Sequence, residues 1–360
     1  MKPRNQASVA PSTTIESIGN QILNEMSSAE TLCAAINAFV QTCSTATGIT
    51  PDPSFDAWAE DALLDGGVAI NPQAAAQCAL DYQRTVVFIR GVYAALIDLR
   101  ARFPTTTLKI LYAGCGPYAT LLLPLLAKFA PGELRASLLD THQESLDSVA
   151  QLLNRFGLST YNVDLIQGDA CHYQHPEKLH LIIAETLQKA LEQEPQFAVT
   201  AHLAPQLLPA GVFIPQEIEV DLCLADLATE QAIFTERQRS NLGTLKERDQ
   251  RYPIATLCTL SPEQAPTQLR LARHNAVTKK LELAEQAVSI PADVDLNGLE
   301  AALFTRILVF GEHGLNDYEA QITLPLKCHA LMPLVNGANY RVSYQLGSYP
   351  MFSFEHVKSV

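Results

Sequence analysis

The stretch Lys109-Ile-Leu-Tyr-Ala-Gly-Cys-Gly-Pro-Tyr-Ala119 decides the fold of this chain. Its first half is an apolar run typical of a buried strand, and its second half is a Gly-x-Gly-x-x-Ala turn over 114–119. Glycine lets the backbone approach a ligand closely, and a helix start behind the turn offers free N–H groups. The pattern therefore predicts a strand, a ligand-binding turn and a helix, and it suits dinucleotides as well as other nucleotide-like ligands.

Strands and helices alternate from this stretch onward. The strands are continuous apolar runs, as expected where helices cover both faces of a parallel sheet. The expected strands are 108–113, 134–140, 163–167 and 179–184, and the expected helices are 118–129, 144–156 and 196–208. The sequence therefore predicts an α/β protein with a Rossmann-like, doubly wound domain.

Extra helices are expected ahead of this domain. The pattern over 15–64 is helical, with Trp58 in the last short helix and Asp65-Gly66-Gly67 ending it. A long helix over 71–103 follows, with Asn71 as its N-cap and Pro72 at its first position.

An antiparallel, β-barrel-like domain is expected behind it. Asn336-Gly337 is a plausible hairpin turn, and 226–250 is polar and helical. Short alternating runs predict strands over 217–224, 305–310, 320–325, 340–344 and 351–354. We predict a helical region over 1–70 that can serve as a dimerisation arm, the Rossmann-like domain over 71–215 and the β-barrel-like domain over 216–360.

Composition narrows the class of partner and the compartment. The chain has 360 residues, of which 48% are hydrophobic, and its net charge is -13. This negative charge argues against binding to nucleic acid or to anionic membranes. Eight scattered cysteines without a Cys-x-x-Cys pair indicate a reducing compartment. Neither a signal core nor a long apolar run is present in the sequence, so we expect a soluble cytoplasmic protein.

Two aspartates follow the Gly-rich turn at the ends of later strands. Asp140, followed by Thr141, is placed to accept hydrogen bonds from both hydroxyls of a ribose, or alternatively to cap the next helix. Asp169, followed by Ala170, can accept the exocyclic amine of an adenine, or can be a turn aspartate.

Two glutamates, nine residues apart, follow the strand over 179–184. Glu185 ends that strand, and Glu194 lies in a polar loop just before Pro195. Two carboxylates converging on a guanidinium make charge-assisted hydrogen bonds, and a guanidinium is always protonated. The alternative is that Glu192 and Glu194 are solvated loop carboxylates. Together with the Gly-rich turn, the pair indicates S-adenosylmethionine and a guanidinium acceptor.

Several motifs are similar to those of the protein arginine methyltransferases. The stretch 184–194 resembles that family's double-E loop, 208–215 resembles its strand entering the β-barrel, and 316–325 and 334–342 resemble its closing barrel strands. Asp81-Tyr-Gln-Arg84-Thr resembles its Asp-x-x-Arg-Thr helix. The resemblance implies catalytic roles for Glu185 and Glu194 and a grip by Arg84 on the cofactor carboxylate. Without it, Asp81 and Arg84 would be a surface ion pair. The cofactor-binding set that follows is Arg84, Gly114, Cys115, Gly116, Asp140, Thr141, Asp169 and Ala170.

The departures from the family pattern concern the substrate. Gly314-Leu-Asn-Asp-Tyr318 stands where the family has a Thr-His-Trp loop, so His313 and Tyr318 are the candidate substrate-binding residues. Tyr112 stands where an aspartate is usual. The departures favour the small-molecule branch, which resembles the L-arginine N-methyltransferases of bacterial natural-product pathways. Arg306 and Arg341 are further candidates for binding the acceptor's carboxylate.

Other functions stay open at this stage. An aminocarboxypropyl transferase resembling nicotianamine synthase uses a similar Gly-x-Gly-Pro turn, and a protein arginine methyltransferase shares the motifs. A non-catalytic scaffold would explain the missing histidine loop, and an oxidoreductase lacks an obvious acid and base. Cys171, His172 and His175 lie in one short loop without a fourth ligand, so no metal is expected. The resemblance implies a homodimer.

Overall fold

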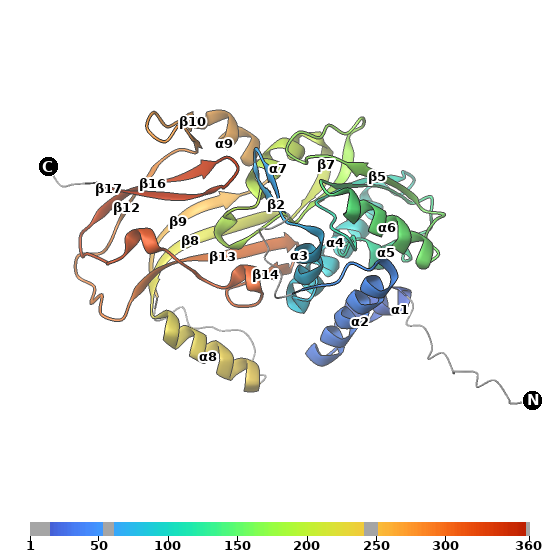
Figure 1. The fold of residues 1–360 in the computed structure, drawn as a ribbon, viewed down its shortest axis with the longest axis horizontal. Coiled ribbons are helices and arrows are strands. Elements are labelled where there is room, and N and C mark those ends of the chain that lie inside the picture. The colour runs from blue at the N-terminus through green and yellow to red at the C-terminus, as the bar shows by residue number, and fades with distance from the viewer. Residues whose placement is uncertain (1–14, 53–60, 241–250, 358–360) are drawn as a thin grey trace, which may run out of the picture.

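The computed structural model describes residues 15–52, 61–240 and 251–357 (Figure 1). The predictions for Trp58 and for residues 241–250 lie outside these ranges.

A five-stranded parallel sheet forms the middle of the molecule, in the order β5-β4-β3-β6-β7. Its strands are β3 (Leu108–Ala113), β4 (Leu134–Asp140), β5 (Asn162–Gln167), β6 (Leu179–Ala184) and β7 (Leu207–Ile214). The strands β4 and β5 follow β3 on one side of it, and the later strands β6 and β7 lie on its other side. The strand order therefore reverses at β3, and its carboxyl end lies at a topological switch point. Open α/β sheets bind ligands at such points.

Helices cover both faces of this sheet, which confirms the predicted α/β class. Ile110 and Ile183 belong to the core beneath α4 (Tyr82–Arg102) and α6 (Gln143–Arg155), whereas Leu111 and Ile182 pack with Val199 of α7 (Gln196–Leu203). Alternate residues of a strand point to opposite faces, which explains why apolar residues occupy both sets of positions in these strands.

Three helix predictions in this region were wrong in extent. The helix expected over 118–129 is reduced to α5 (Leu123–Leu126), because Pro124 cannot donate to the carbonyl of Thr120 and its ring would clash there. The helix expected over 71–103 is broken into α3 (Pro72–Cys78), with Asn71 as its N-cap, and α4. The helix expected to reach residue 208 ends earlier, since the 3-10 helix η2 (Ala204–Gln206) leads directly into β7.

The N-terminal region contains two helices and a hairpin. The helices α1 (Ile15–Leu23) and α2 (Ala29–Thr47) pack on α4, α5 and α6. The predicted helical pattern fails over β1 (Ala62–Leu64), which pairs antiparallel with β2 (Gly67–Ala69). The cause is Asp65-Gly66, a two-residue turn that favours a hairpin.

Antiparallel sheets follow Pro215, as predicted. One contains β8 (Glu217–Ala225), β9 (Tyr252–Leu260), β13 (Glu300–Phe310), β14 (His313–Leu315) and β15 (Leu326–Lys327). The other contains β10 (Arg273–His274), β11 (Leu281–Glu282), β12 (Gln286–Ser289), β16 (Asn339–Leu346) and β17 (Met351–Val357). The helix α8 (Leu227–Ser240) projects from this antiparallel domain, and α9 (Ala265–Leu271) lies beside α7 (Figure 1).

Two details of this domain differ from expectation. Residues 320–325 form the 3-10 helix η3 (Gln321–Thr323) instead of a strand, and the 3-10 helix η4 (His329–Leu331) follows β15. Asn336-Gly337 does form a turn, closed by the N–H of Ala338 donating to the carbonyl of Val335, but it precedes β16 and does not join two of the expected strands.

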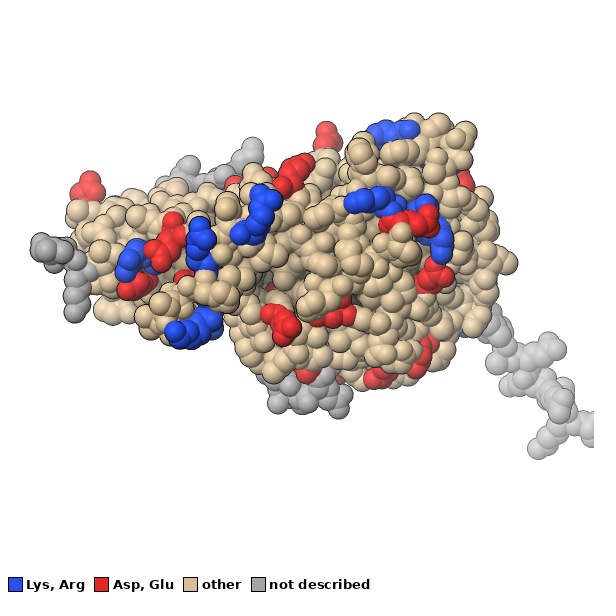
Figure 2. All heavy atoms as spheres, turned by 90° about the horizontal axis from the view of Figure 1, so that it is seen from above, with Lys and Arg blue, Asp and Glu red and all other residues tan. Residues whose placement is uncertain are grey.

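Figure 2 shows Lys and Arg side chains interspersed with Asp and Glu over one face of the molecule, without a continuous basic patch on that face. Among the helices in the described ranges, none is both long enough and apolar enough to cross a lipid bilayer.

Candidate functional site

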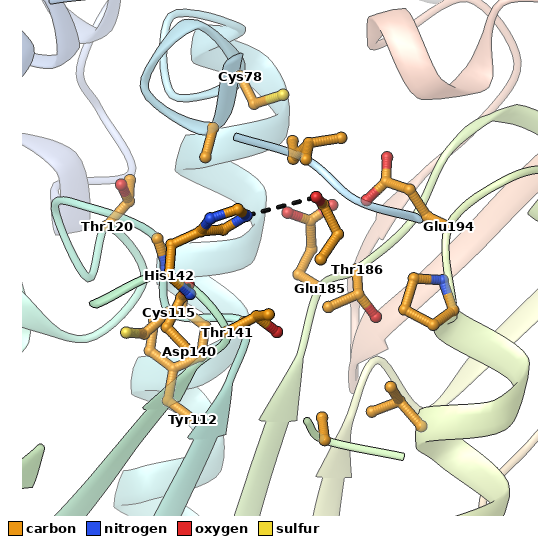
Figure 3. A pocket seen from close by; sticks show the side chains of 18 of the residues that line it. Cys78, Tyr112, Cys115, Thr120, Asp140, Thr141, His142, Glu185, Thr186 and Glu194 are labelled. Carbon is orange, nitrogen blue, oxygen red and sulfur yellow. Dashed lines mark hydrogen bonds between the residues drawn. The ribbon is translucent and has the colours of Figure 1, made fainter. Parts of the chain in front are cut away.

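A pocket opens at the carboxyl edge of the parallel sheet, where β3, β4, β5 and β6 end (Figure 3). It contains about 990 Å³ of space, part of it open to solvent. The sequence-predicted residues that line it are Arg84, Gly114, Cys115, Gly116, Asp140, Thr141, Asp169, Ala170, Glu185 and Glu194. Residues distant in the chain are therefore brought to one cavity.

The Gly-rich turn lines the pocket at the carboxyl end of β3. Gly114 and Gly116 have φ angles of 67° and 63°, which L side chains rarely adopt. A Cβ on Gly114 would lie 2.6 Å from Cγ2 of Thr186, so the turn also packs tightly against the strand end of β6. The helix expected immediately behind the turn is absent, because α5 begins only at Leu123. The turn itself, and not a helix start, faces the pocket.

Asp140 keeps acceptor capacity while its carboxylate is held in place. Its two oxygens accept the backbone N–H groups of Gly116 and His142, at 2.8 Å and 2.9 Å. Each carboxylate oxygen has two lone pairs, so each can accept one more hydrogen bond. Burial raises the pKa of Asp140, and the two N–H groups oppose that rise. Two adjacent acceptor positions suit the vicinal hydroxyls of a ribose.

Asp169 lines the same pocket and also organises its own loop. Its carboxylate accepts the N–H of Cys171 at 2.8 Å and lies 2.9 Å from Nδ1 of His172. Asp169 is therefore a turn aspartate that also lines the cavity, and its contact with an adenine stays a prediction. Within the described residues, no group of three or more His, Cys, Asp or Glu side chains is arranged to hold a metal ion.

Arg84 and Glu185 form an ion pair inside the pocket, across 101 residues of chain. Their side chains are 10% and 13% exposed, so the pair is largely shielded from water. Burial opposes the charged form of Arg84, but the charges of Glu185, Cys78 and Glu194 and the hydrogen bond to Glu185 together outweigh it and raise the arginine's pKa. Burial raises the pKa of Glu185, and Arg84 opposes that rise. A guanidinium has five N–H donors, so Arg84 can bind a second carboxylate while it contacts Glu185.

The alternative reading of Arg84, as the surface partner of Asp81, is wrong. Asp81 occupies the N-cap position of α4, and its carboxylate accepts the N–H of Gln321 at 2.7 Å. Arg84 lies one turn further along and points into the pocket.

Glu194 reaches the pocket from the loop over 186–195, here called the two-glutamate loop. Three non-glycine residues of this loop have positive φ angles: 55° at Ala190, 57° at Leu191 and 68° at Gln193. Such conformations persist only where the surroundings enforce them, and they concentrate at functional sites. Burial raises the pKa of Glu194 to about 8; Arg84 opposes the rise, and Glu185 and Asp61 add to it.

The hairpin of β1 and β2 bridges the two sides of the pocket. The N–H of Val68 donates to the carbonyl of Gln193 at 2.7 Å, and Nε2 of His142 lies 3.4 Å from the carbonyl oxygen of Ala69, the contact drawn in Figure 3. Leu64, Val68 and Ala69 line the cavity. Sequence reasoning missed these lining residues, although the Asp-Gly turn between two apolar triplets was the signal for a hairpin.

Gly67 is the point of closest approach between the hairpin and the two-glutamate loop. Its φ is 154°, and a Cβ there would lie 2.5 Å from the nitrogen of Pro195 and 2.7 Å from the carbonyl carbon of Glu194. We expect Gly67→Ala to push the loop away, to destabilise the protein by about 1–3 kcal/mol and to weaken acceptor binding.

Thermal unfolding and acceptor titration of Gly67→Ala measure this effect. Gly48→Ala is the matched control, because Gly48 also has a positive φ (79°) but nothing lies within 4 Å of its Cβ position. Equal acceptor affinity in the two variants would contradict the role assigned to Gly67.

The two substrate-binding candidates of the antiparallel domain, His313 and Tyr318, do not line this pocket. His313 is on β14, which packs on α4 beside Gly91, and it does not line the pocket. Tyr318 is 3% exposed, donates its hydroxyl to Glu230 and stacks on Phe234 with ring centroids 5.3 Å apart. Both predictions therefore need correction: linear proximity to the missing histidine loop does not bring these side chains to the glutamates.

The basic candidates for an acceptor carboxylate are also engaged elsewhere. Arg306 pairs with Glu219 and Asp221, and Arg341 pairs with Glu355 at the surface. Among the described residues that line the pocket, Arg84 is the only lysine or arginine.

Comparison with known proteins gives structural likeness only. No protein-family model matches the chain, and no curated protein sequence matches it. The PRMT1 enzyme–prozyme heterotetrameric complex of Trypanosoma brucei, determined with AdoHcy, is similar over 78% of this chain and 96% of that chain, with 14% identity and a TM-score of 0.44. Arabidopsis thaliana protein arginine methyltransferase 10, in an open conformation, is similar over 79% of this chain and 98% of that chain, with 11% identity and a TM-score of 0.46. At this level of similarity, neither structure says which reaction this chain performs.

Proposed function

We propose that this protein is an S-adenosylmethionine-dependent N-methyltransferase acting on a guanidino group. The observation that carries the proposal is the convergence of Glu185 and Glu194 on one pocket that also contains Asp140, the Gly-rich turn and Arg84. The cofactor, when bound, supplies an electrophilic methyl group on a sulfonium. In the proposal, Asp140 binds the ribose hydroxyls, Asp169 faces the adenine and Arg84 binds the amino-acid carboxylate.

The chain's own contribution to the reaction is positioning and charge. Glu185 and Glu194 hold the guanidinium so that one terminal nitrogen faces the methyl group, and they draw positive charge away from that nitrogen. Glu194 is the group that can take up the proton released after transfer, since its pKa of about 8 lies near neutrality. Glu185 remains paired with Arg84, whose charge opposes the rise in the pKa of Glu185 that burial causes.

The acceptor that we propose is a small guanidine, free L-arginine or a relative, as in natural-product biosynthesis. A second acceptor class is favoured by one observation: Arg84 is the only lysine or arginine among the described pocket-lining residues. If Arg84 binds the cofactor, none of the other described residues that line the pocket is a lysine or arginine that could bind the carboxylate of a free amino acid. An arginine within a peptide, or a decarboxylated guanidine, does not need such a partner.

A turnover assay read by mass spectrometry separates these acceptors. The protein is offered S-adenosylmethionine with L-arginine, with agmatine as the same chain lacking the carboxylate, and with an arginine-containing peptide. We expect a methylated guanidine from at least one small acceptor. Product from the peptide alone would move the chain to the protein-modifying class, and methylthioadenosine as by-product would indicate aminocarboxypropyl transfer instead.

We further propose a cytoplasmic homodimer. The apolar faces of α1 and α2 are buried within their own chain, as Ile18 and Phe39 illustrate, so these helices are not a free apolar arm. A monomeric mass at micromolar concentration would remove the dimer from the proposal.

A further inference from the structure

Two buried hydroxyl groups of the antiparallel domain hold the two-glutamate loop. Oγ1 of Thr305, on β13, accepts the N–H of Ala190 at 2.9 Å. The hydroxyl of Tyr344, on β16, donates to the carbonyl of Leu191 at 2.5 Å. Thr305 is 0% and Tyr344 3% exposed, so water does not compete for either hydrogen bond. Both side chains therefore fix backbone that belongs to the loop carrying Glu194.

The residues that they hold are the strained ones. Ala190 and Leu191 both have left-handed backbone conformations, with φ angles of 55° and 57°. For a residue with a Cβ this conformation costs about 1–2 kcal/mol. Without an acceptor for the N–H of Ala190 and a donor for the carbonyl of Leu191, this turn would relax toward ordinary backbone geometry. The position of Glu194, three residues further along, depends on that turn.

The two ends of the loop are attached to different parts of the molecule. At the Glu185 end, the N–H and hydroxyl of Thr186 donate to Oε1 of Gln196 on α7, at 2.9 Å and 3.2 Å. At the Glu194 end, the N–H of Gln193 donates to the carbonyl of Pro350, between β16 and β17, at 2.8 Å. Glu185 is thus fixed by the parallel sheet and its helix, whereas Glu194 is fixed by the antiparallel domain and the hairpin.

We infer that Thr305 and Tyr344 are positioning residues for the acceptor. They hold the left-handed turn so that the carboxylate of Glu194 meets the same guanidinium as Glu185. Neither side chain lines the pocket, so they act through the loop and not by touching the acceptor. This inference rests on the proposed function, and it gives the antiparallel domain a role in the reaction beyond support.

The variants Tyr344→Phe and Thr305→Val remove one hydroxyl each and keep the volume of the side chain. We expect each to lower kcat/KM for the acceptor by about 10-fold, the loss of one net buried hydrogen bond, while the Kd for S-adenosylmethionine changes by less than about 2-fold. Thr305→Ser retains the hydroxyl and should restore most of the activity. Tyr161→Phe is the matched control, since it removes a tyrosine hydrogen bond, to the carbonyl of Phe129, away from the pocket.

Hydrogen exchange of the loop amides gives a readout that does not need turnover. In Thr305→Val the Ala190 amide should exchange at least about 10-fold faster than in the wild type, with the control variant unchanged. Unchanged exchange in the loop, or an acceptor kcat/KM equal to that of the wild type, would overturn the inference. A loss that falls equally on cofactor Kd would also overturn it, because it would indicate general destabilisation. If the wild type methylates no guanidine, the proposed function fails, while hydrogen exchange still decides whether the hydroxyls hold the loop.

Discussion

Replacing Glu185 with glutamine is expected to lower kcat/KM for the guanidine by about 10²- to 10³-fold. The change keeps the size of the side chain but removes its charge. The acceptor then loses one of its two charge-assisted hydrogen bonds, and Arg84 loses its buried partner. Steady-state kinetics with each substrate varied in turn will show the loss. We expect it mainly in kcat, since the interaction with the attacking nitrogen matters most during transfer.

Glu177→Gln is the control for this experiment. Glu177 also pairs with basic groups, Lys109 and Arg135, but it lies at the surface and outside the pocket. Surface pairs contribute little, so this variant should keep wild-type kinetics. Activity of Glu185→Gln within about 3-fold of the wild type would contradict a role for the carboxylate in catalysis.

The second large effect is a pH dependence of acceptor binding that originates in Glu194. Because burial raises the pKa of Glu194 to about 8, its carboxyl is mostly protonated at neutral pH before a cation binds. A guanidinium needs the carboxylate, so binding below that pH releases one proton. Acceptor affinity should therefore rise about tenfold per pH unit up to about pH 8 and then level off.

Calorimetric titration of the acceptor at several pH values, in buffers of different ionisation enthalpy, measures both the slope and the proton release. In Glu194→Gln the affinity should be weaker and the slope lost. Arg84 stays charged over this range, and burial raises the pKa of Cys78 to about 11, so neither produces the same profile. The same slope in Glu194→Gln would assign the titration to another group, with Glu185 the first to consider, since its pKa is also raised.

The raised pKa of Glu194 also makes the stability of the folded protein depend on pH. A carboxyl whose pKa is raised in the folded state stabilises the protein at low pH and loses that contribution as pH rises through the folded pKa. For Glu194 the loss should occur between about pH 4.5 and 8. Without substrates, Glu194→Gln should therefore unfold at a higher temperature than the wild type at pH 9, and the difference should shrink toward acid pH. A lower unfolding temperature at pH 9 would contradict the burial of this charge.

Four of the five strands of the parallel sheet could be predicted from their apolar pattern to within a residue, whereas β7 was indicated only by the family resemblance over 208–215. The strands β4 and β6 are mostly apolar, with Asp140 at the end of the first and Glu185 directly after the second, and parallel strands bring such ends to one edge. The ion pair between Arg84 and Glu185 could not be derived in this way, because its partners are 101 residues apart and meet only through packing of α4 on the sheet.

The errors have specific physical causes. The hairpin over 62–69 was hidden by an apolar pattern that suits a helix as well as a strand, and only Asp65-Gly66 distinguished them. His313 and Tyr318 were chosen by position in the chain, whereas β14 carries the first against α4 and a buried network with Glu230 holds the second. Side chains on antiparallel strands depend on register, which local sequence does not give.

The most direct test of the account is to follow the fate of the methyl group. The protein is incubated with S-adenosylmethionine carrying a deuterated methyl group and with the best guanidine, and both products are identified by mass spectrometry. We predict that all three deuterium atoms appear on a guanidino nitrogen, in equal amount with adenosylhomocysteine, and that Glu185→Gln lowers the rate at which both products form by about 10²- to 10³-fold. Release of methylthioadenosine, or transfer to any atom other than a guanidino nitrogen, would contradict it.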